Sequence, residues 1–250
     1  MTKPTLVLLH AFPVNSSMYD DVRDPLGMLC NLITPDLAGF GEAGLSESEP
    51  SLDVLAGDLA ALLDQHGVGR AIIGGTSMGG YVAMAFLRLH PERVAGLILA
   101  DTKATADSPD ARANRLAVAD QVVTAGSTDA LARAMLPNLL GATTQNSRPG
   151  VVDRVRGWIE SAHPEAVAWA QRAMAARPDS LDDLATFEGP ALVVWGSEDG
   201  ITPRSEQAIM RSELVDGEFV TLNGAGHLSA IEDPNGFVAV VSPFVTRFDA

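Results

Sequence analysis

Residues 71–80 read AIIGGTSMGG, and this stretch decides the fold. Its first part, residues 71–74, is a short apolar run of the kind found in strands that are buried on both faces. Its last residues open a helical pattern over 78–90, which ends before Pro91. A strand that passes through a glycine-rich turn directly into a helix is a βα unit, and repeated βα units predict a parallel sheet.

The same alternation continues on both sides of this stretch. Five further apolar runs predict strands, at 5–10, 31–34, 94–100, 191–195 and near 219–222. Helical patterns lie between or after them, at 51–66, after Pro203 and after Pro234. Because helices separate the strands, we expect about six mostly parallel strands joined by right-handed crossovers.

Between the fourth and fifth strands the pattern changes. Residues 103–187 show no convincing strand, and Gly, Ser, Thr and Pro gather at the joints between helical segments. Four helices are predicted there, at 111–125, 128–140, 151–161 and 164–176. We therefore predict an α/β core made of residues 1–102 and 188–250, with an all-helical cap at 103–187.

Composition and charge exclude several classes of partner. With 46% hydrophobic residues in a chain of 250, a large core can form. The net charge of −15 disfavours nucleic acid and anionic membranes, because their phosphates would be repelled. No apolar run approaches the roughly 20 residues that span a bilayer. The lone Cys30 permits no internal disulfide and fits a reducing compartment, so we expect a cytoplasmic protein.

The acidity is uneven along the chain. Residues 102–187 carry a net charge of −1, and the remainder carries −14. The simpler interpretation is that the outer helices of the core provide solubility. The alternative is that a near-neutral segment covers a pocket for an uncharged ligand.

Ser77 lies in the spacing Gly75-x-Ser77-x-Gly79. This spacing is typical of a nucleophile elbow, in which a strained turn lifts a serine hydroxyl clear of the sheet. The two glycines leave room where the strand and helix backbones nearly touch. Glycine-rich turns of this kind also bind phosphates, but the strand before and the helix after favour a nucleophile.

A serine hydroxyl is a weak nucleophile and needs a base. His227 follows the last strand in the small-residue loop Asn-Gly-Ala-Gly-His, from which it could reach across the carboxyl edge of the sheet. The other four histidines have structural interpretations. Among them, His10 ends the first strand and is expected to organise the adjacent loop.

The base in turn needs a carboxylate that sets its tautomer and stabilises the imidazolium. Asp199 follows the fifth strand and is the preferred candidate, because ligands of open α/β sheets gather at the carboxyl ends of strands. Asp101, which ends the fourth strand, and Glu198 are the competitors. A tetrahedral intermediate also needs backbone donors for its oxyanion, and the amides of Met78 and Phe12 are predicted to supply them.

Taken together, these pieces resemble the α/β-hydrolases of the capped esterase and lactonase group, which includes 3-oxoadipate enol-lactonases and related small bacterial esterases. The matching segments are residues 10–13 (HAFP), 36–41 (DLAGFG), 75–80 (GTSMGG), Asp101, 196–199 (GSED) with Pro203, and Gly226-His227. The resemblance implies the α/β-hydrolase fold and a triad in the chain order Ser77, Asp199, His227.

Two departures from that family stand out. Ala11 replaces the glycine that usually follows the first histidine, so its backbone must suit alanine. Members of that family usually carry an antiparallel hairpin before the first strand, whereas here that strand is predicted to begin at residue 5. We therefore expect a sheet trimmed to about six strands.

The predicted reaction is hydrolysis of a carboxylic ester or lactone through an acyl-enzyme on Ser77. Candidate pocket residues are His10, Trp158 and Met135. No metal-ligand spacing such as H-E-x-x-H occurs, and no cofactor is expected. The expected partner is a small ester or lactone, neutral because of the acidic core, and a homo-oligomer is left open.

Two alternatives remain open. The same triad could serve a cofactor-free perhydrolase or a carbon–carbon bond hydrolase. A different class would be a ligand-binding signalling protein on the hydrolase fold with negligible turnover.

Overall fold

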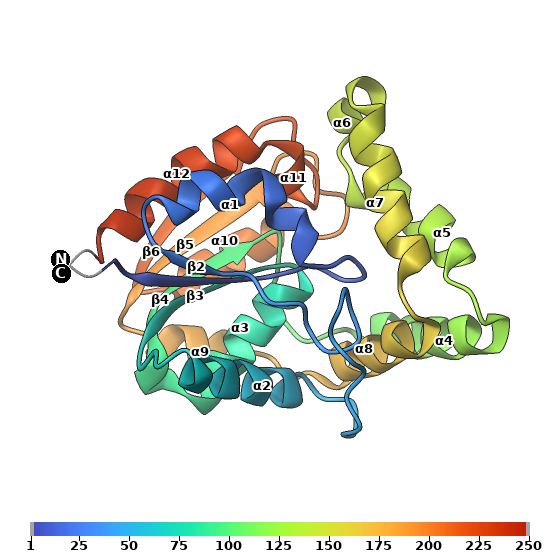
Figure 1. Ribbon diagram of the computed structural model, residues 1–250, viewed down its shortest axis with the longest axis horizontal. Helices are drawn as coiled ribbons and strands as arrows, with labels where there is room; N and C mark the ends of the chain where they lie inside the picture. Colours follow the sequence, from blue (N-terminus) through green and yellow to red (C-terminus); the bar gives the residue numbers. More distant parts are fainter. Residues whose placement is uncertain (1–2, 249–250) are drawn as a thin grey trace.

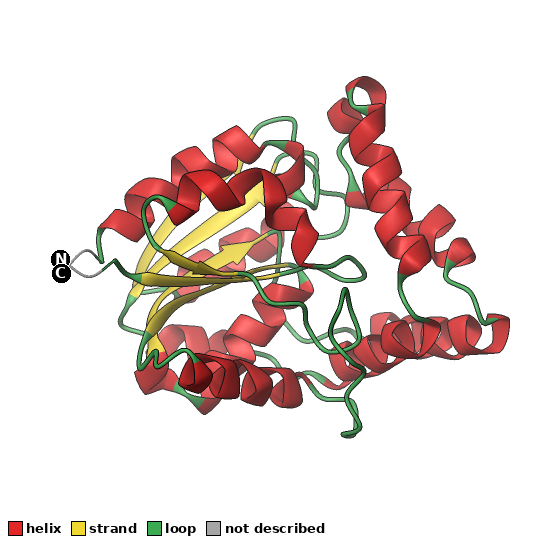
Figure 2. Cartoon of the chain, viewed as in Figure 1, coloured by secondary structure: helices red, strands yellow, loops and turns green. Residues whose placement is uncertain are grey.

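The computed structural model describes residues 3–248, which contain one six-stranded sheet (Figures 1 and 2). All neighbouring strands pair in parallel, in the order β2-β1-β3-β4-β5-β6. The strands are β1 (Thr5–Leu9), β2 (Asn31–Ile33), β3 (Ala71–Thr76), β4 (Val94–Ala100), β5 (Pro190–Gly196) and β6 (Asp216–Leu222). The predicted sheet of about six parallel strands is confirmed.

Helices cover both faces of the sheet (Figure 1). One layer contains α1 (Asp20–Gly27), α11 (Ser229–Glu232) and α12 (Pro234–Thr246). The other layer contains α2 (Leu52–Gln65), α3 (Met78–Leu89) and α10 (Arg204–Glu213). Two short 3₁₀ turns, η1 (Ser16–Tyr19) and η2 (Pro91–Arg93), lie in the connections. Buried apolar side chains of the strands fill the space between these layers.

The strand predicted at the position of β3 was too short. The apolar run ends at residue 74, but the strand continues to Thr76 because Gly74 and Gly75 pair with Leu8 and Leu9 of β1 on one side and with β4 on the other. Glycine is a poor strand former on its own, so pairing on both sides decides the conformation here. The first helix of the chain, α1, was not predicted.

The chain between β4 and β5 forms six helices: α4 (Pro109–Ala125), α5 (Asp129–Leu139), α6 (Ala142–Ser147), α7 (Pro149–Ser161), α8 (Pro164–Ala176) and α9 (Leu181–Thr186). The predictions missed α6 and α9, which are only six residues long each. Helices α4 to α8 lie beyond the carboxyl ends of the strands, at the right of Figure 1. In contrast, α9 contacts α3 and α10 of the core. That this insert acts as a cap stays a prediction.

Every strand enters the sheet from the same side, so all the loops that follow the strands lie at the edge that faces the insert (Figure 1). The predicted Ser77, Asp199 and His227 follow β3, β5 and β6 in turn. Within residues 3–248, no helix combines the length and the apolar character needed to cross a membrane.

Candidate active site

Ser77 forms a strained link between β3 and α3. Its backbone has φ 55° and ψ −113°, a left-handed conformation that costs free energy for a residue with a side chain. The Ser77 amide donates to the carbonyl of Ala100 (2.9 Å), and the Ser77 carbonyl accepts from the Thr102 hydroxyl (2.8 Å). The end of β4 therefore holds the turn in place, as a nucleophile elbow requires.

Two glycines allow the elbow to pack against its surroundings. A Cβ on Gly79 would lie 2.0 Å from the carbonyl oxygen of Leu9, and a Cβ on Gly75 would lie 2.2 Å from the carbonyl carbon of Gly79. Neither position can accept a methyl group without a backbone shift. The first turn of α3 consequently packs directly onto the end of β1, beside the loop that carries Phe12.

The two predicted oxyanion donors lie on these neighbouring segments. Met78 is the first residue of α3, so its N–H has no acceptor within the helix. Phe12 is buried on the loop after β1, and its ring packs edge-on against Phe40 with 6.1 Å between ring centroids. Their role as oxyanion donors stays a prediction.

His10 holds the loop after β1 in place through two hydrogen bonds. Its Nδ1 lies 2.9 Å from the carbonyl oxygen of Ala11, and its Nε2 accepts from the amide of Leu37 at 2.9 Å. Complete burial lowers the pKa of His10 to about 4, so the ring is neutral and carries its proton on Nδ1. The expected organising role fits these bonds. Both ring nitrogens of His10 are therefore engaged by backbone groups, and a place for His10 in the substrate pocket stays a prediction.

His227 and Asp199 form a buried pair. The Nδ1 of His227 lies 3.0 and 2.9 Å from the two carboxylate oxygens of Asp199, and both side chains are at most 1% exposed. Asp199 is fixed in turn by the amides of Ile201 (2.7 Å) and Thr202 (3.0 Å) and by the Thr202 hydroxyl. This arrangement places the proton of a neutral imidazole on Nδ1 and leaves Nε2 able to accept one.

The two partners shift each other's protonation. Burial by itself would lower the pKa of His227, but the negative charge and hydrogen bond of Asp199 outweigh it, so the pKa of His227 is raised. Burial would raise the pKa of Asp199, and the charge of His227 outweighs it in the opposite direction, so the pKa of Asp199 is lowered. The pair therefore favours the imidazolium form that a general base reaches during catalysis.

Asp101 binds backbone amides instead of the imidazole. It directly follows β4 with φ 46°, is completely buried, and accepts from the amides of Gly196 (2.8 Å) and Ser229 (3.1 Å). Burial, with the nearby charge of Asp199 as a second cause, raises the pKa of Asp101 to about 7. Asp101 thereby joins the end of β5 to the residue two positions beyond His227.

These hydrogen bonds also connect the chain segments that carry the three predicted site residues. Ser77 is bonded to the residues on either side of Asp101, while Asp101 is bonded to the loops of Asp199 and His227. Glu198, the third candidate acid, points elsewhere and accepts from the amide and hydroxyl of Thr143. Of the three carboxylates weighed from the sequence, Asp199 is the one that the structure pairs with His227.

Trp158 lies at the junction between the insert and the core. It is half-buried and lines a cavity of about 230 Å³ together with Pro13, Val14 and Phe40, next to the loop of Phe12. Met135 packs, half-buried, against the hydrophobic core cluster. Trp158 is thus the predicted pocket residue that the structure brings to a cavity near the site.

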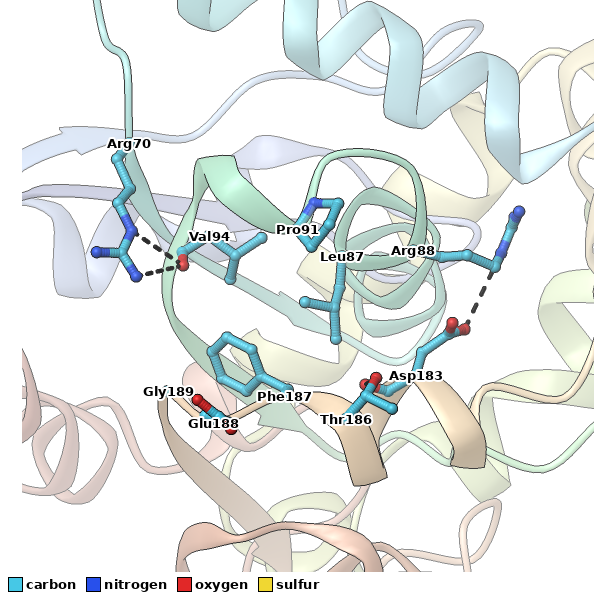
Figure 3. A pocket seen from close by; sticks show the side chains of 10 residues that line it. All are labelled: Arg70, Leu87, Arg88, Pro91, Val94, Asp183, Thr186, Phe187, Glu188 and Gly189. Carbon is cyan, nitrogen blue, oxygen red and sulfur yellow. Dashed lines mark hydrogen bonds and ion pairs between the residues drawn. The ribbon is translucent and has the colours of Figure 1, made fainter.

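A second cavity, of about 320 Å³, lies far from this site (Figure 3). It is lined by Val94 at the amino end of β4, which is about 20 Å from the carboxyl end of that strand at the rise of an extended chain. Its arginines already have partners, because Arg70 donates to the carbonyl of Val94 and Arg88 lies 4.0 Å from Asp183. This cavity is therefore separate from Ser77.

Two residues that matter to this site were not identified from the sequence. Thr102 holds the carbonyl of Ser77, and Glu232 holds the amide that follows His227. A signal existed for Glu232, since it is an acidic residue after the largely apolar run 228–231, and buried acids usually have dedicated partners. Within residues 3–248, no group of three or more His, Cys, Asp or Glu side chains is arranged to hold a metal ion.

Comparison with known proteins gives consistent matches over nearly the whole chain. The family model described as alpha/beta hydrolase fold matches residues 4–234. A pimeloyl-[acyl-carrier protein] methyl ester esterase of Aeromonas salmonicida is 31% identical, with 97% of this chain and 95% of that protein covered.

Two solved structures are also similar. A thermophilic esterase from Thermogutta terrifontis, with malate bound, is 38% identical with a TM-score of 0.95, covering 98% of this chain and 90% of that one. The enol-lactonase from Burkholderia xenovorans LB400 is 26% identical with a TM-score of 0.90, covering 98% and 92%. Both agree with the fold class expected from the sequence.

Proposed function

This chain belongs to the α/β-hydrolase family, and we propose that within it the chain is a serine hydrolase that cleaves a neutral carboxylic ester or lactone through an acyl-enzyme on Ser77. One observation carries the proposal. A buried histidine, His227, is hydrogen-bonded to the buried carboxylate of Asp199 at the same sheet edge as a serine held with positive φ. This combination is the arrangement that activates a serine hydroxyl.

The proposed mechanism uses only groups of this chain and water. His227 Nε2 takes the Ser77 proton while Oγ attacks the substrate carbonyl, and the amides of Met78 and Phe12 bind the resulting oxyanion. Collapse of the tetrahedral intermediate returns the proton from His227 to the leaving alcohol oxygen. Water, deprotonated by the same imidazole, then attacks the acyl-enzyme and releases the carboxylic acid.

The arginines of the insert favour a neutral substrate. Arg154, Arg156 and Arg172 are paired with Asp21, Asp153 and Asp120. Arg148 donates to the backbone carbonyls of Ile231 and Glu232, and Arg133 lies on the exposed face of α5. Four of these five arginines are thus engaged, and Arg115 and Arg177 of the same insert are paired with Asp107, so few remain to bind a substrate carboxylate.

The similar proteins support the ester or lactone class. By their descriptions, they are an esterase that acts on a methyl ester, a thermophilic esterase and an enol-lactonase. All three descriptions concern cleavage of an acyl–oxygen bond, which is the bond broken in the proposed mechanism.

A graded panel of esters and lactones tests the proposed substrate class. We expect p-nitrophenyl esters of short acyl chains and uncharged lactones to be hydrolysed. A matched pair, ethyl butyrate and monoethyl succinate, isolates the charge. With a chain of net charge −15, the neutral ester should show a kcat/KM at least about tenfold higher at low salt. Preference for the anionic ester would contradict a neutral substrate, and no turnover of any member would contradict the hydrolase.

Exchange of one aspartate at a time tests the assignment of the acid. Asp199→Asn should lower kcat about 10⁴-fold, because the amide stabilises neither the required tautomer nor the imidazolium. Loss of the negative charge also lowers the pKa of His227, so the acid limb of the pH–rate profile should move to lower pH. Asp101→Asn is the matched control and should cost far less. Profiles of kcat/KM against pH for p-nitrophenyl acetate would decide which aspartate is the partner of His227. A larger loss of kcat in Asp101→Asn than in Asp199→Asn would assign that role to Asp101.

A further inference from the structure

Glu232 joins the histidine loop to the helical insert. It ends α11 and is only 6% exposed. One of its carboxylate oxygens accepts from the amide of Leu228 (3.1 Å), the residue after His227. The other accepts from the amide of Gly141 (2.7 Å), which lies in the insert between α5 and α6. A single buried carboxylate thus bridges two backbone donors that are 87 positions apart in the numbering.

The same part of the insert contacts the loops of both paired residues. The His227 amide donates to the carbonyl of Leu139 at 3.1 Å. On the other side, Thr143 donates through its amide (2.8 Å) and its hydroxyl (2.6 Å) to Glu198, the neighbour of Asp199. The backbones are also close, since a Cβ on Gly226 would lie 2.2 Å from the amide nitrogen of Gly141. Residues 139–144 therefore lie between the two loops.

The loop that carries His227 needs such supports. It contains Gly224, with φ 77°, and Gly226, so its own backbone restricts the imidazole weakly. Burying a carboxylate also costs free energy unless its oxygens are satisfied, and burial raises the pKa of Glu232. Arg148 is bonded to the backbone carbonyl of Glu232 and not to its carboxylate. The carboxylate instead contacts the backbone amides beside His227, the Gly141 amide of the insert and the side chain of Thr144, also in the insert.

We infer that Glu232 is a positioning residue for His227, which it holds in place by tying the histidine loop to residues 139–144 of the insert. The inference rests on the proposed function, in which His227 is the general base. It means that the insert does more than cover a pocket, because its junction between α5 and α6 supports the base directly. Glu232 acts through His227 and needs no contact with substrate.

The test compares Glu232→Gln with a structural control on the next residue. In Glu232→Gln one oxygen becomes an NH₂ donor that faces a backbone N–H, so one tether is lost. We expect kcat for p-nitrophenyl acetate to fall about tenfold to a hundredfold through displacement of the imidazole, with KM unchanged. A longer-chain ester should lose as much, because the defect lies in the base and not in substrate contacts.

The pH profile separates positioning from general destabilisation. The charges around His227 are those of Asp199, Asp101 and Glu232, and each raises the pKa of His227. Glu232→Gln removes one of them, so the acid limb of kcat/KM should move to lower pH. Glu232→Asp keeps the charge but is too short to reach both amides. It should therefore lose kcat without moving the limb, and it serves as the test should Glu232→Gln not fold.

Asp233→Asn is the matched control. Asp233 caps α12 by accepting from the amide of Gly236 at 2.9 Å, and asparagine caps a helix about as well as aspartate, so Asp233→Asn should keep both Tm and kcat close to the wild-type values. Should Glu232→Gln and Glu232→Asp keep wild-type kcat, as Asp233→Asn is expected to do, the inference is wrong. Failure of the proposed function has a different signature, because Ser77→Ala would then be as active as the wild type.

Discussion

Replacing Ser77 with alanine is expected to lower kcat for p-nitrophenyl acetate about a million-fold, close to the background of the assay. The reason is that no covalent intermediate can form without the hydroxyl, and residual catalysis can come only from the oxyanion donors and from binding. The fold should survive. Alanine meets the same backbone strain at φ 55° as serine does, and the tethers of this residue are made by its backbone.

A fluorophosphonate probe reports the same chemistry without a substrate. It should label the wild-type protein at Ser77 and leave Ser77→Ala unlabelled. Ser212→Ala is a suitable control, because Ser212 is an exposed serine on α10 whose hydroxyl bonds within its own helix. Equal labelling of wild type and Ser77→Ala would remove the central claim about the nucleophile.

His227→Ala is expected to cause a loss of similar size, about a million-fold in kcat. Without the imidazole, nothing takes the Ser77 proton, and the buried Asp199 loses its hydrogen-bonding partner. Since the two residues act as a unit, the double variant Ser77→Ala/His227→Ala should be no slower than either single variant. Steady-state rates of all three variants would show this non-additivity.

The exposed His66 provides the control for that experiment. It caps the end of α2 shortly before β3 begins, away from the carboxyl ends of the strands, so His66→Ala should keep the wild-type rate. If His227→Ala also kept the wild-type rate, another group would have to be the base, and the inferred positioning role of Glu232 would be wrong as well.

The inferred role of Glu232 implies that the insert affects the catalytic rate as well as substrate binding. An insert that only shaped the pocket could be altered with effects on KM and substrate choice alone. Here residues 139–144 bond the loops of both His227 and Asp199. Changes at the junction of α5 and α6 should consequently reach kcat, even for substrates too small to touch the insert.

Local patterns explain why so much of the fold was predictable. Buried parallel strands are continuous apolar runs, and prolines and glycines end the helices, so β4 and α8 were placed to the residue. The last two residues of β3 were missed, because their strand conformation comes from pairing with β1 and β4. The six-residue helices α6 and α9 were missed because one or two turns carry too little periodicity to detect.

By itself, the sequence determined the elbow and the order of the site residues along the chain. Gly75, Ser77 and Gly79 are close in sequence, so the sharp turn that carries the hydroxyl is encoded locally. Only the tertiary structure decided which carboxylate serves the histidine. Asp101 and Asp199 both follow core strands, but Asp101 is turned onto the amides of Gly196 and Ser229, while Asp199 faces the imidazole. A hydrogen bond depends on side-chain direction as well as on position, and packing between segments distant in the chain sets that direction.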